Sequence, residues 1–280
     1  MIWIGPAGIP LSCKGMGIKR GIECVREKGL SAMEVQFVRG VTVKREEVGK
    51  EIYEKSKEER VRLSVHAPYY INLASDDEKV IEKSKERIKS SCLAAHWMGA
   101  SPVVVHAGYY SKRLGKKGTY SLIRKSLSEV LEDLNSSGIT DVKIGIETMG
   151  KQKSFGTLDE VISLSSELEG VVPVIDFAHI HSRTNGGIRS REDYSSILDK
   201  LEEVLEEGVA GHIHFTCVEY SKGNERRHLT LEAKEPDFSP LAEELSSRDG
   251  DFVLISESPI LEEDALKMKE EILKRGGRIA

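Results

Sequence analysis

The sequence predicts an α/β protein built as a single (β/α)8 barrel. Eight short β-rich runs are spread over the 280 residues and alternate with longer amphipathic, charged runs. Strands separated by helices form parallel sheets. Eight such units in a chain of this length favour a closed barrel over an open doubly wound sheet. The segment after the first run reads GPAG, which is not the phosphate-binding fingerprint G-x-G-x-x-G of the open folds.

The expected strands are rich in Val, Ile and Leu. Several are almost continuously apolar, as strands buried on both faces should be. In chain order they are Ile2–Gly5, Ala32–Phe37, Arg62–His66, Pro102–His106, Lys143–Glu147, Val172–Asp176, Ala210–Phe215 and Phe252–Glu257.

Between the strands, apolar residues recur at helical spacing. The expected helices are Asp76–Gly99, Tyr120–Leu134, Leu158–Leu168, Ser190–Leu205 and Glu262–Arg275. Acidic Asp159 and Glu160 in a first turn, and Gly170 and Gly276 after last turns, match the preferences of helix ends. No linker or low-complexity tract divides the chain, so residues 1–280 are expected to form one domain.

Composition limits the function classes. The chain is 39% hydrophobic and 31% charged with a formal net charge of −5, so no global basic field indicates nucleic acid. A local basic face can still bind phosphates on an acidic protein. The four cysteines, Cys13, Cys24, Cys92 and Cys217, show no paired spacing, so we expect reduced core residues in a cytoplasmic protein. The chain shows no signal-peptide pattern and no membrane-spanning run, and nothing in it indicates a protein partner.

Six consecutive expected strands, the third to the eighth, end in His, Asp or Glu. These residues are His66, His106, Glu147, Asp176 with His179 and His181 just beyond it, His212 with His214, and Glu257. His228 lies in the loop after the seventh strand. Because barrels of this class build their active sites at the carboxyl ends of the strands, we expect these side chains to converge there.

Imidazoles and carboxylates without thiolates suit Zn²⁺, and also Mn²⁺ or Fe²⁺. Several carboxylates in one mouth would repel each other unless cations neutralised them. A bridging carboxylate such as Glu147 can join two metals, which then clamp the attacking and leaving oxygens of a displacement on phosphorus. Two alternatives stay open, namely hydrogen-bonded structural roles for these residues and a metal-free acid–base site.

These strand ends resemble those of the endonuclease IV family, the metal-dependent apurinic/apyrimidinic endonucleases among the xylose-isomerase-like TIM barrels. The motifs that carry the resemblance are HAPYYINLAS from His66, VVVHAG, IGIET, IDFAH, HIHF, RRH ending at His228, and SESP at Glu257. The resemblance therefore covers nearly the whole chain.

The resemblance implies two or three divalent metals per chain, usually Zn²⁺, with Mn²⁺ as an alternative. The first metal would be held by His66, His106 and Glu147. The second would be held by Glu147, Asp176, Glu257 and one strand-seven histidine, for which His214 is preferred over His212. The third would be held by His179 and His228. The family has Asp-x-His in this last loop, whereas this chain has Arg226-Arg227-His228. Either Glu225 substitutes after a small loop shift, or the third metal is weak, absent or differently liganded, with help from His181.

The resemblance also implies base excision repair of double-stranded DNA that contains abasic sites. The phosphodiester 5′ to the abasic site would be hydrolysed by a metal-activated water to leave a 3′-hydroxyl, with Glu147 as the catalytic bridge. Tyr69, Gln36 and Arg39 would insert at the lesion. A phosphate-binding rim would include Arg183, Arg189, Arg191, Lys112, Arg113, Lys116 and Lys117.

Two other functions remain open. A sugar isomerase or epimerase of the same superfamily needs one metal, for which Glu147, Asp176, His214 and Glu257 would suffice. A damaged-DNA-binding protein with weak cleavage would be consistent with Arg226 at a ligand position. Metal stoichiometry separates these functions, because the isomerase requires one metal and the nuclease requires two or three.

Overall fold

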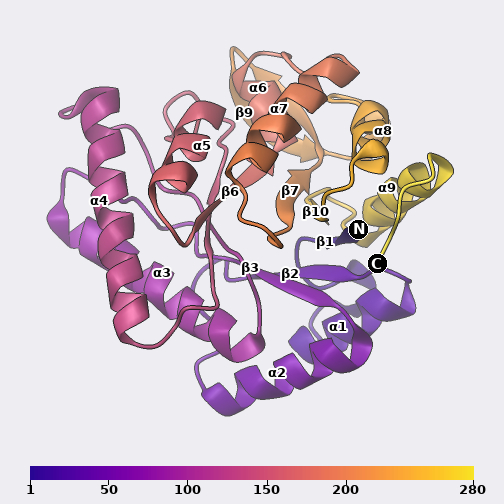
Figure 1. Ribbon diagram of the computed structural model, residues 1–280, viewed down its shortest axis with the longest axis horizontal. Helices are drawn as coiled ribbons and strands as arrows, with labels where there is room; N and C mark the ends of the chain where they lie inside the picture. The colour runs from indigo at the N-terminus through magenta and orange to yellow at the C-terminus, as the bar shows by residue number, and fades with distance from the viewer.

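The computed structural model describes residues 1–280 and contains a barrel of eight parallel strands. The strands lie in the order β1-β10-β7-β6-β5-β4-β3-β2, with helices around them (Figure 1). They are β1 (Ile2–Pro6), β2 (Ala32–Gln36), β3 (Arg62–His66), β4 (Val103–Val105), β5 (Ile144–Glu147), β6 (Val171–Asp176), β7 (Gly211–Phe215) and β10 (Phe252–Ser256). The predicted fold class is confirmed, and each strand end lies within about one residue of its expected place.

The barrel closes between β1 and β2. The backbone N–H of Ser31 donates to the carbonyl of Ile4 at 2.9 Å, and a parallel bridge joins Ala7 to Glu34. A Cβ at Gly5 would lie 1.5 Å from the carbonyl oxygen of Ala32, so only glycine permits this approach of the two backbones. Closure places the carboxyl ends of all eight strands around one mouth.

Amphipathic helices cover the outside of the barrel (Figure 1). The expected helices are confirmed as α3 (Glu78–Met98), α4 (Gly115–Ser136), α5 (Leu158–Glu167), α7 (Arg191–Val204) and α9 (Glu262–Lys274). One continuous apolar cluster fills the space between the strands and the helices and gives the mouth a rigid support. None of the helices combines the length and the apolar character needed to cross a membrane.

Three outer helices have no counterpart among the expected ones, namely α1 (Gly17–Glu27), α2 (Glu46–Glu59) and α8 (Phe238–Ser247). Glycine lowers helix propensity, and α1 and α2 contain Gly21 and Gly49. A Cβ at Gly49 would lie 2.3 Å from the Cβ of Trp97, so this glycine serves the packing of α2 on α3. Its purpose is visible only in the tertiary structure.

Two short elements extend the mouth. Helix α6 (Phe177–Arg183) begins directly after β6. The segment after β7, expected as a loop, is an antiparallel hairpin of β8 (Cys217–Ser221) and β9 (Asn224–Leu229). Both elements carry side chains of the site described below.

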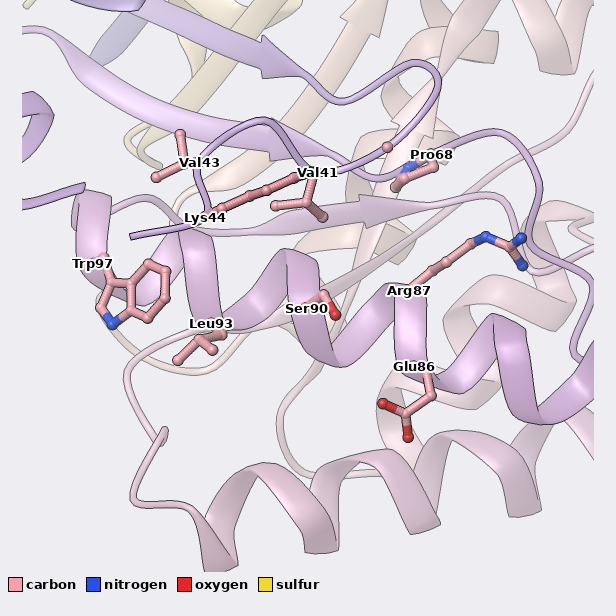
Figure 2. Close-up of a pocket in the computed structure, with 10 residues that line it drawn as sticks. Val41, Val43, Lys44, Pro68, Glu86, Arg87, Ser90, Leu93 and Trp97 are labelled. Atoms are coloured by element: carbon pink, nitrogen blue, oxygen red, sulfur yellow. The ribbon is translucent and has the colours of Figure 1, made fainter. Parts of the chain in front are cut away.

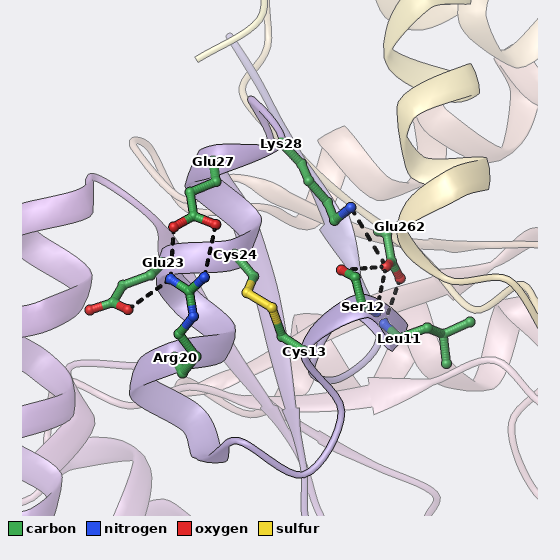
Figure 3. The surroundings of a disulfide bond; sticks show 9 residues. All are labelled: Leu11, Ser12, Cys13, Arg20, Glu23, Cys24, Glu27, Lys28 and Glu262. Carbon is green, nitrogen blue, oxygen red and sulfur yellow. Dashed lines mark hydrogen bonds and ion pairs between the residues drawn. A yellow bond between two sulfur atoms is a disulfide. The ribbon is translucent and has the colours of Figure 1, made fainter.

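Cys13 and Cys24 form a disulfide between the short helix η1 (Leu11–Cys13) and α1 (Figure 3). The expectation that all four cysteines are reduced is therefore wrong for this pair. Glycines at positive φ, Gly15 and Gly17, reverse the chain so that α1 returns past η1, which the spacing of the two cysteines does not reveal. Cys92 and Cys217 are free and buried, as expected.

Candidate metal centre

The carboxyl ends of the strands bring imidazoles and carboxylates together in one mouth. Four groups of ligand atoms in the barrel are close enough to hold a metal ion, and three of them lie in this mouth: His66, His106 and Glu147; Glu147, Asp176, His214 and Glu257; and His179, Glu225 and His228. Glu147 belongs to two of these groups, which is the arrangement of a bridging carboxylate.

Glu147 lies at the centre of the mouth and is buried. Its Oε2 is 2.8 Å from His106 Nε2 and 3.3 Å from His66 Nε2. Its Oε1 is 3.6 Å from His214 Nδ1. Burial raises the pKa of Glu147, but His106 and the other imidazoles around it outweigh burial and hold that pKa well below its usual range. Glu147 is therefore an anion between the first two groups.

Asp176 shows why a cation fits the second group. Its Oδ1 accepts the backbone N–H of His179 at 2.7 Å and caps α6, while its Oδ2 is buried without a partner. Burial, opposed by His179 and reinforced by the carboxylates of Glu257 and Glu147, raises the pKa of Asp176 to about 7. Glu147 Oε1 and His214 Nδ1 are also buried without a hydrogen-bond partner, although His179 Nδ1 lies 3.0 Å from Glu147 Oε1. Buried polar atoms are normally satisfied, so these converging orphan atoms fit a divalent metal.

The imidazoles are held from outside the centre. Four of them bind an outer acceptor with one ring nitrogen: His66 Nδ1 binds the Ala67 carbonyl at 2.8 Å, His179 Nδ1 the Thr148 carbonyl at 2.8 Å, His228 Nδ1 the Glu257 carbonyl at 3.0 Å, and His214 Nε2 the Glu34 carboxylate at 3.0 Å. Carbonyls and carboxylates only accept, so the bound nitrogen carries the proton. The other nitrogen of each ring therefore offers its lone pair to the centre, which is the outer arrangement typical of metal-binding histidines.

The third group depends on a β-bulge in the hairpin. Tyr220 pairs with Glu225 and Glu219 with Arg227, so Arg226 is the extra residue and the register shifts there. Residues three apart in a regular strand face opposite sides, and the bulge turns Glu225 and His228 to the same side. Glu225 lies 3.4 Å from His179 Nε2 and 3.6 Å from His228 Nε2, whereas Arg226 is exposed. Although burial raises the pKa of Glu225, the hydrogen bond and charge of His179 bring it down to about 2.

His181, the other candidate for the third set, lies elsewhere. Its Nδ1 accepts the backbone N–H of Ile188 at 3.3 Å, and its Nε2 is 2.5 Å from Glu235 Oε1. Glu235 also accepts the hydroxyl of Tyr220 at 3.0 Å, so this cluster holds the hairpin against α6. The structure therefore does not bring His181 into the third group, because both of its nitrogens have other partners.

Arg183 is bound to the backbone of the loop after β5. Its guanidinium donates to the carbonyls of Met149, Lys151 and Ser154 at 3.2, 2.6 and 3.0 Å. It therefore holds this loop, and the expected DNA contact of Arg183 stays a prediction. Of the other expected rim residues, Arg191 is paired with Glu243 and Glu244.

The three residues expected at the DNA lesion differ in exposure and in their hydrogen bonds. Tyr69 is 48% exposed, and its ring centre lies 5.3 Å from that of His66. Arg39 is exposed. Gln36 is only partly exposed, and its amide donates to Glu34 Oε1 at 3.0 Å, so it points into the barrel rather than out of the mouth.

The mouth contains a cavity of about 340 Å³. Besides the metal-ligand candidates, its lining includes Tyr69, Tyr109, Met149, Lys151 and Lys153. The two lysines, which follow β5, were not among the expected site residues, because nothing in the sequence marks one surface lysine among many. The Lys153 ammonium lies 5.2 Å from the ring centre of Tyr109, which keeps it beside the cavity.

Glu34 is a second residue absent from the expected site. It is fully buried on β2 and contacts His212 and His214. The sequence does indicate this residue, because a carboxylate in the middle of the apolar run AMEVQF requires buried hydrogen-bond partners.

A separate hollow of about 480 Å³ lies between residues 40–44 and α3 (Figure 2). Val41, Val43, Leu93 and Trp97 give it an apolar lining. Its carboxylate, Glu86, is paired with Lys89. None of the groups of metal-ligating side chains lies there.

Comparisons with known proteins give the family. A family model described as xylose isomerase-like TIM barrel matches residues 22–274. An uncharacterised protein of Methanocaldococcus jannaschii is 36% identical over 268 residues, which cover 95% of each chain. The probable endonuclease 4 of Mycobacterium leprae is 37% identical over 70 residues, 25% of this chain and 28% of that protein.

Solved structures share the fold. Endonuclease IV from Thermus thermophilus has a TM-score of 0.73 at 18% identity, covering 98% of this chain and 97% of that one. A D-tagatose 3-epimerase-like protein has a TM-score of 0.70 at 23% identity, covering 91% of both chains. These findings confirm the resemblance to endonuclease IV, but the same fold carries an epimerase-like relative, so the fold alone does not decide the reaction.

Proposed function

Because the chain belongs to the xylose isomerase-like TIM barrel family, we propose that it is a metal-dependent DNA-repair endonuclease. It would cut the phosphodiester 5′ to an abasic site in double-stranded DNA and leave a 3′-hydroxyl. The observation that carries this proposal is the presence of three ligand groups in one mouth, two of which share Glu147. An isomerase or epimerase with one metal needs only the second group, so the first and third groups favour a displacement on phosphorus.

The donor set consists of imidazole nitrogens and carboxylate oxygens, which suits Zn²⁺ and also accepts Mn²⁺. When bound, such metals supply Lewis acidity and lower the pKa of a water. The chain's own residues keep the donors aimed at the centre, since outer hydrogen bonds hold His66, His179 and His228 before any substrate arrives. Such preorganisation avoids reorientation during the reaction.

Glu147 is the residue to which we assign the catalytic role. It is an anion in contact with both the first and the second group, so it can hold the two halves of the centre together and orient the attacking water. Tyr69 offers a half-exposed ring at the mouth on which an extruded sugar or a neighbouring base can stack. Extrusion of an abasic nucleotide is inexpensive, because no base pair is lost.

Lys151 and Lys153 support an anionic substrate over a neutral sugar. Both line the cavity, where their ammonium groups add positive charge beside the carboxylates of the site. Changing either lysine to methionine is expected to lower the salt dependence of DNA binding by about 0.9 in the slope of log K against log salt, because one phosphate contact is lost. The slope is measured by fluorescence anisotropy on a duplex with a non-cleavable linkage at the scissile position.

The matched control is Lys274→Met, an exposed lysine at the carboxyl end of α9 that does not line the cavity. Its slope should equal that of the unaltered protein. Equal slopes in all three variants would mean that Lys151 and Lys153 contact no phosphate.

The proposed activity is tested on a duplex with one abasic site and on the same duplex without it. The purified protein should nick only the first, lose the activity in excess chelator, and regain it with Zn²⁺ or Mn²⁺. Metal analysis should give two or three ions per chain. One metal per chain, with no nicking and with turnover of a ketose, would replace the proposal with the sugar isomerase or epimerase.

A further inference from the structure

Glu34 lies in the barrel interior below the mouth, and its carboxylate accepts four hydrogen bonds. Its Oε2 accepts the hydroxyl of Ser64, the Nε2 of His212 and the Nε2 of His214, each at 3.0 Å. Its Oε1 accepts the amide of Gln36 at 3.0 Å. The side chain is 0% exposed, so the carboxylate is stabilised by these four contacts alone.

The contact with His214 decides which ring nitrogen faces the second ligand group. A carboxylate accepts and does not donate, so Nε2 of His214 carries the proton. The remaining nitrogen, Nδ1, is buried without a hydrogen-bond partner. It lies 3.4 Å from Glu257 Oε1 and 3.6 Å from Glu147 Oε1.

We propose that Glu34 is a positioning residue, which orients His214 so that Nδ1 is the ligand of a divalent metal in the second group. This inference rests on the metal centre of the proposed function, and it assigns a role to a residue outside the three ligand groups. A carboxylate behind a metal-bound imidazole fixes the ring and makes the ligand more basic. Glu34 lies on β2 and His214 on β7, and these strands are not neighbours in the sheet. The contact between the two side chains therefore crosses the barrel interior.

Glu34, His212 and His214 also lie close enough together to form a ligand group of their own. The contacts favour hydrogen bonding, because both imidazole nitrogens are at 3.0 Å from the same oxygen and Ser64 donates to it as well. A metal bound to Nε2 of His214 would displace the proton that this nitrogen donates. If Nδ1 also held a metal, the ring would have to become an imidazolate. Glu34 therefore acts behind the ligand and is not one itself.

The first measurement uses the unaltered protein loaded with ¹¹³Cd²⁺ and labelled with ¹⁵N-histidine. One-bond coupling between cadmium and Nδ1 of His214 is expected, together with a protonated Nε2. Coupling to Nε2 of His214 would overturn the inference without any variant having to fold.

The second measurement compares the variants Glu34→Gln, Glu34→Asp and Ser64→Ala by competition with a chromogenic Zn²⁺ chelator. Glu34→Gln removes the charge at nearly constant size, and Glu34→Asp keeps the charge but shortens the side chain. Both Glu34 variants are expected to lower the affinity for one metal per chain by about 10–100-fold and to leave the affinities for the other metals unchanged. Ser64→Ala removes a donor to the same oxygen without touching His214, so its metal affinities should stay within about threefold.

Unchanged metal affinities in both Glu34 variants would overturn the inference. Loss of a whole metal equivalent in His212→Phe would also overturn it, because the Glu34 cluster would then be a ligand group. Neither readout uses DNA. If the protein shows the expected coupling but nicks no abasic duplex, the role of Glu34 is retained and the endonuclease is refuted. If the protein nicks the duplex but the Glu34 variants keep their metal affinities, the endonuclease is retained and the role of Glu34 is refuted.

Discussion

Replacing Glu147 by glutamine is expected to lower the rate of abasic-site cleavage by about a thousandfold or more. The carboxylate contacts the first group through Oε2 and the second through Oε1. An amide is neutral and has a single acceptor oxygen, so it cannot serve both groups. Metals supply several kcal/mol of charge stabilisation in such displacements, and each 1.36 kcal/mol is about tenfold in rate. Single-turnover nicking measures the loss of cleavage rate, and metal analysis measures the loss of bound metal.

The control is Glu257→Gln, because Glu257 belongs to the second group alone. Glu147→Gln should reduce the affinity for two metals, and Glu257→Gln for one. If Glu147→Gln nicks at nearly the native rate, the catalytic assignment is contradicted. Circular dichroism checks that the fold of each variant is intact.

Replacing Glu225 by glutamine is expected to remove the third metal and to slow cleavage by about a hundredfold. Glu225 is the single carboxylate of its group, where it lies between His179 and His228. Two imidazoles without the carboxylate leave a weaker site, and charge on the leaving oxygen is then less stabilised. The loss corresponds to about 3 kcal/mol. Metal analysis should fall from three ions to two.

Arg226→Asp tests the same site from the neighbouring position. Because Arg226 is the exposed bulge residue, an aspartate there should leave the metal count and the nicking rate nearly unchanged. If Arg226→Asp instead raised the count from two metals to three, Glu225 would not be the native ligand, and the third group would be incomplete in this chain.

The strand ends were predictable because they combine two local signals. Apolar β-rich runs locate each strand, and in a parallel barrel the residues at the carboxyl ends of all these runs must lie in the same mouth. His66, His106, Glu147, Asp176, His214 and Glu257 therefore come together as expected. The pairing of Asp176 with His179 also arises at short range, since the carboxylate caps the helix on which the imidazole lies.

The remaining features depend on contacts between distant parts of the chain. Arg183 was expected at a phosphate, and one nitrogen of its guanidinium donates to three carbonyls of the loop after β5. Cys13 and Cys24 meet because glycine turns fold α1 back onto η1. Glu225 reaches the third group through a bulge that no periodicity marks.

By itself, the sequence predicted the barrel and the histidines and carboxylates at the ends of its strands, because alternation along the chain and strand direction are local properties. Only the tertiary structure decided which acid completes the third group and which nitrogen of His214 faces the centre. These choices depend on the bulge at Arg226 and on Glu34, which reaches across the barrel from a strand that is not a neighbour of β7.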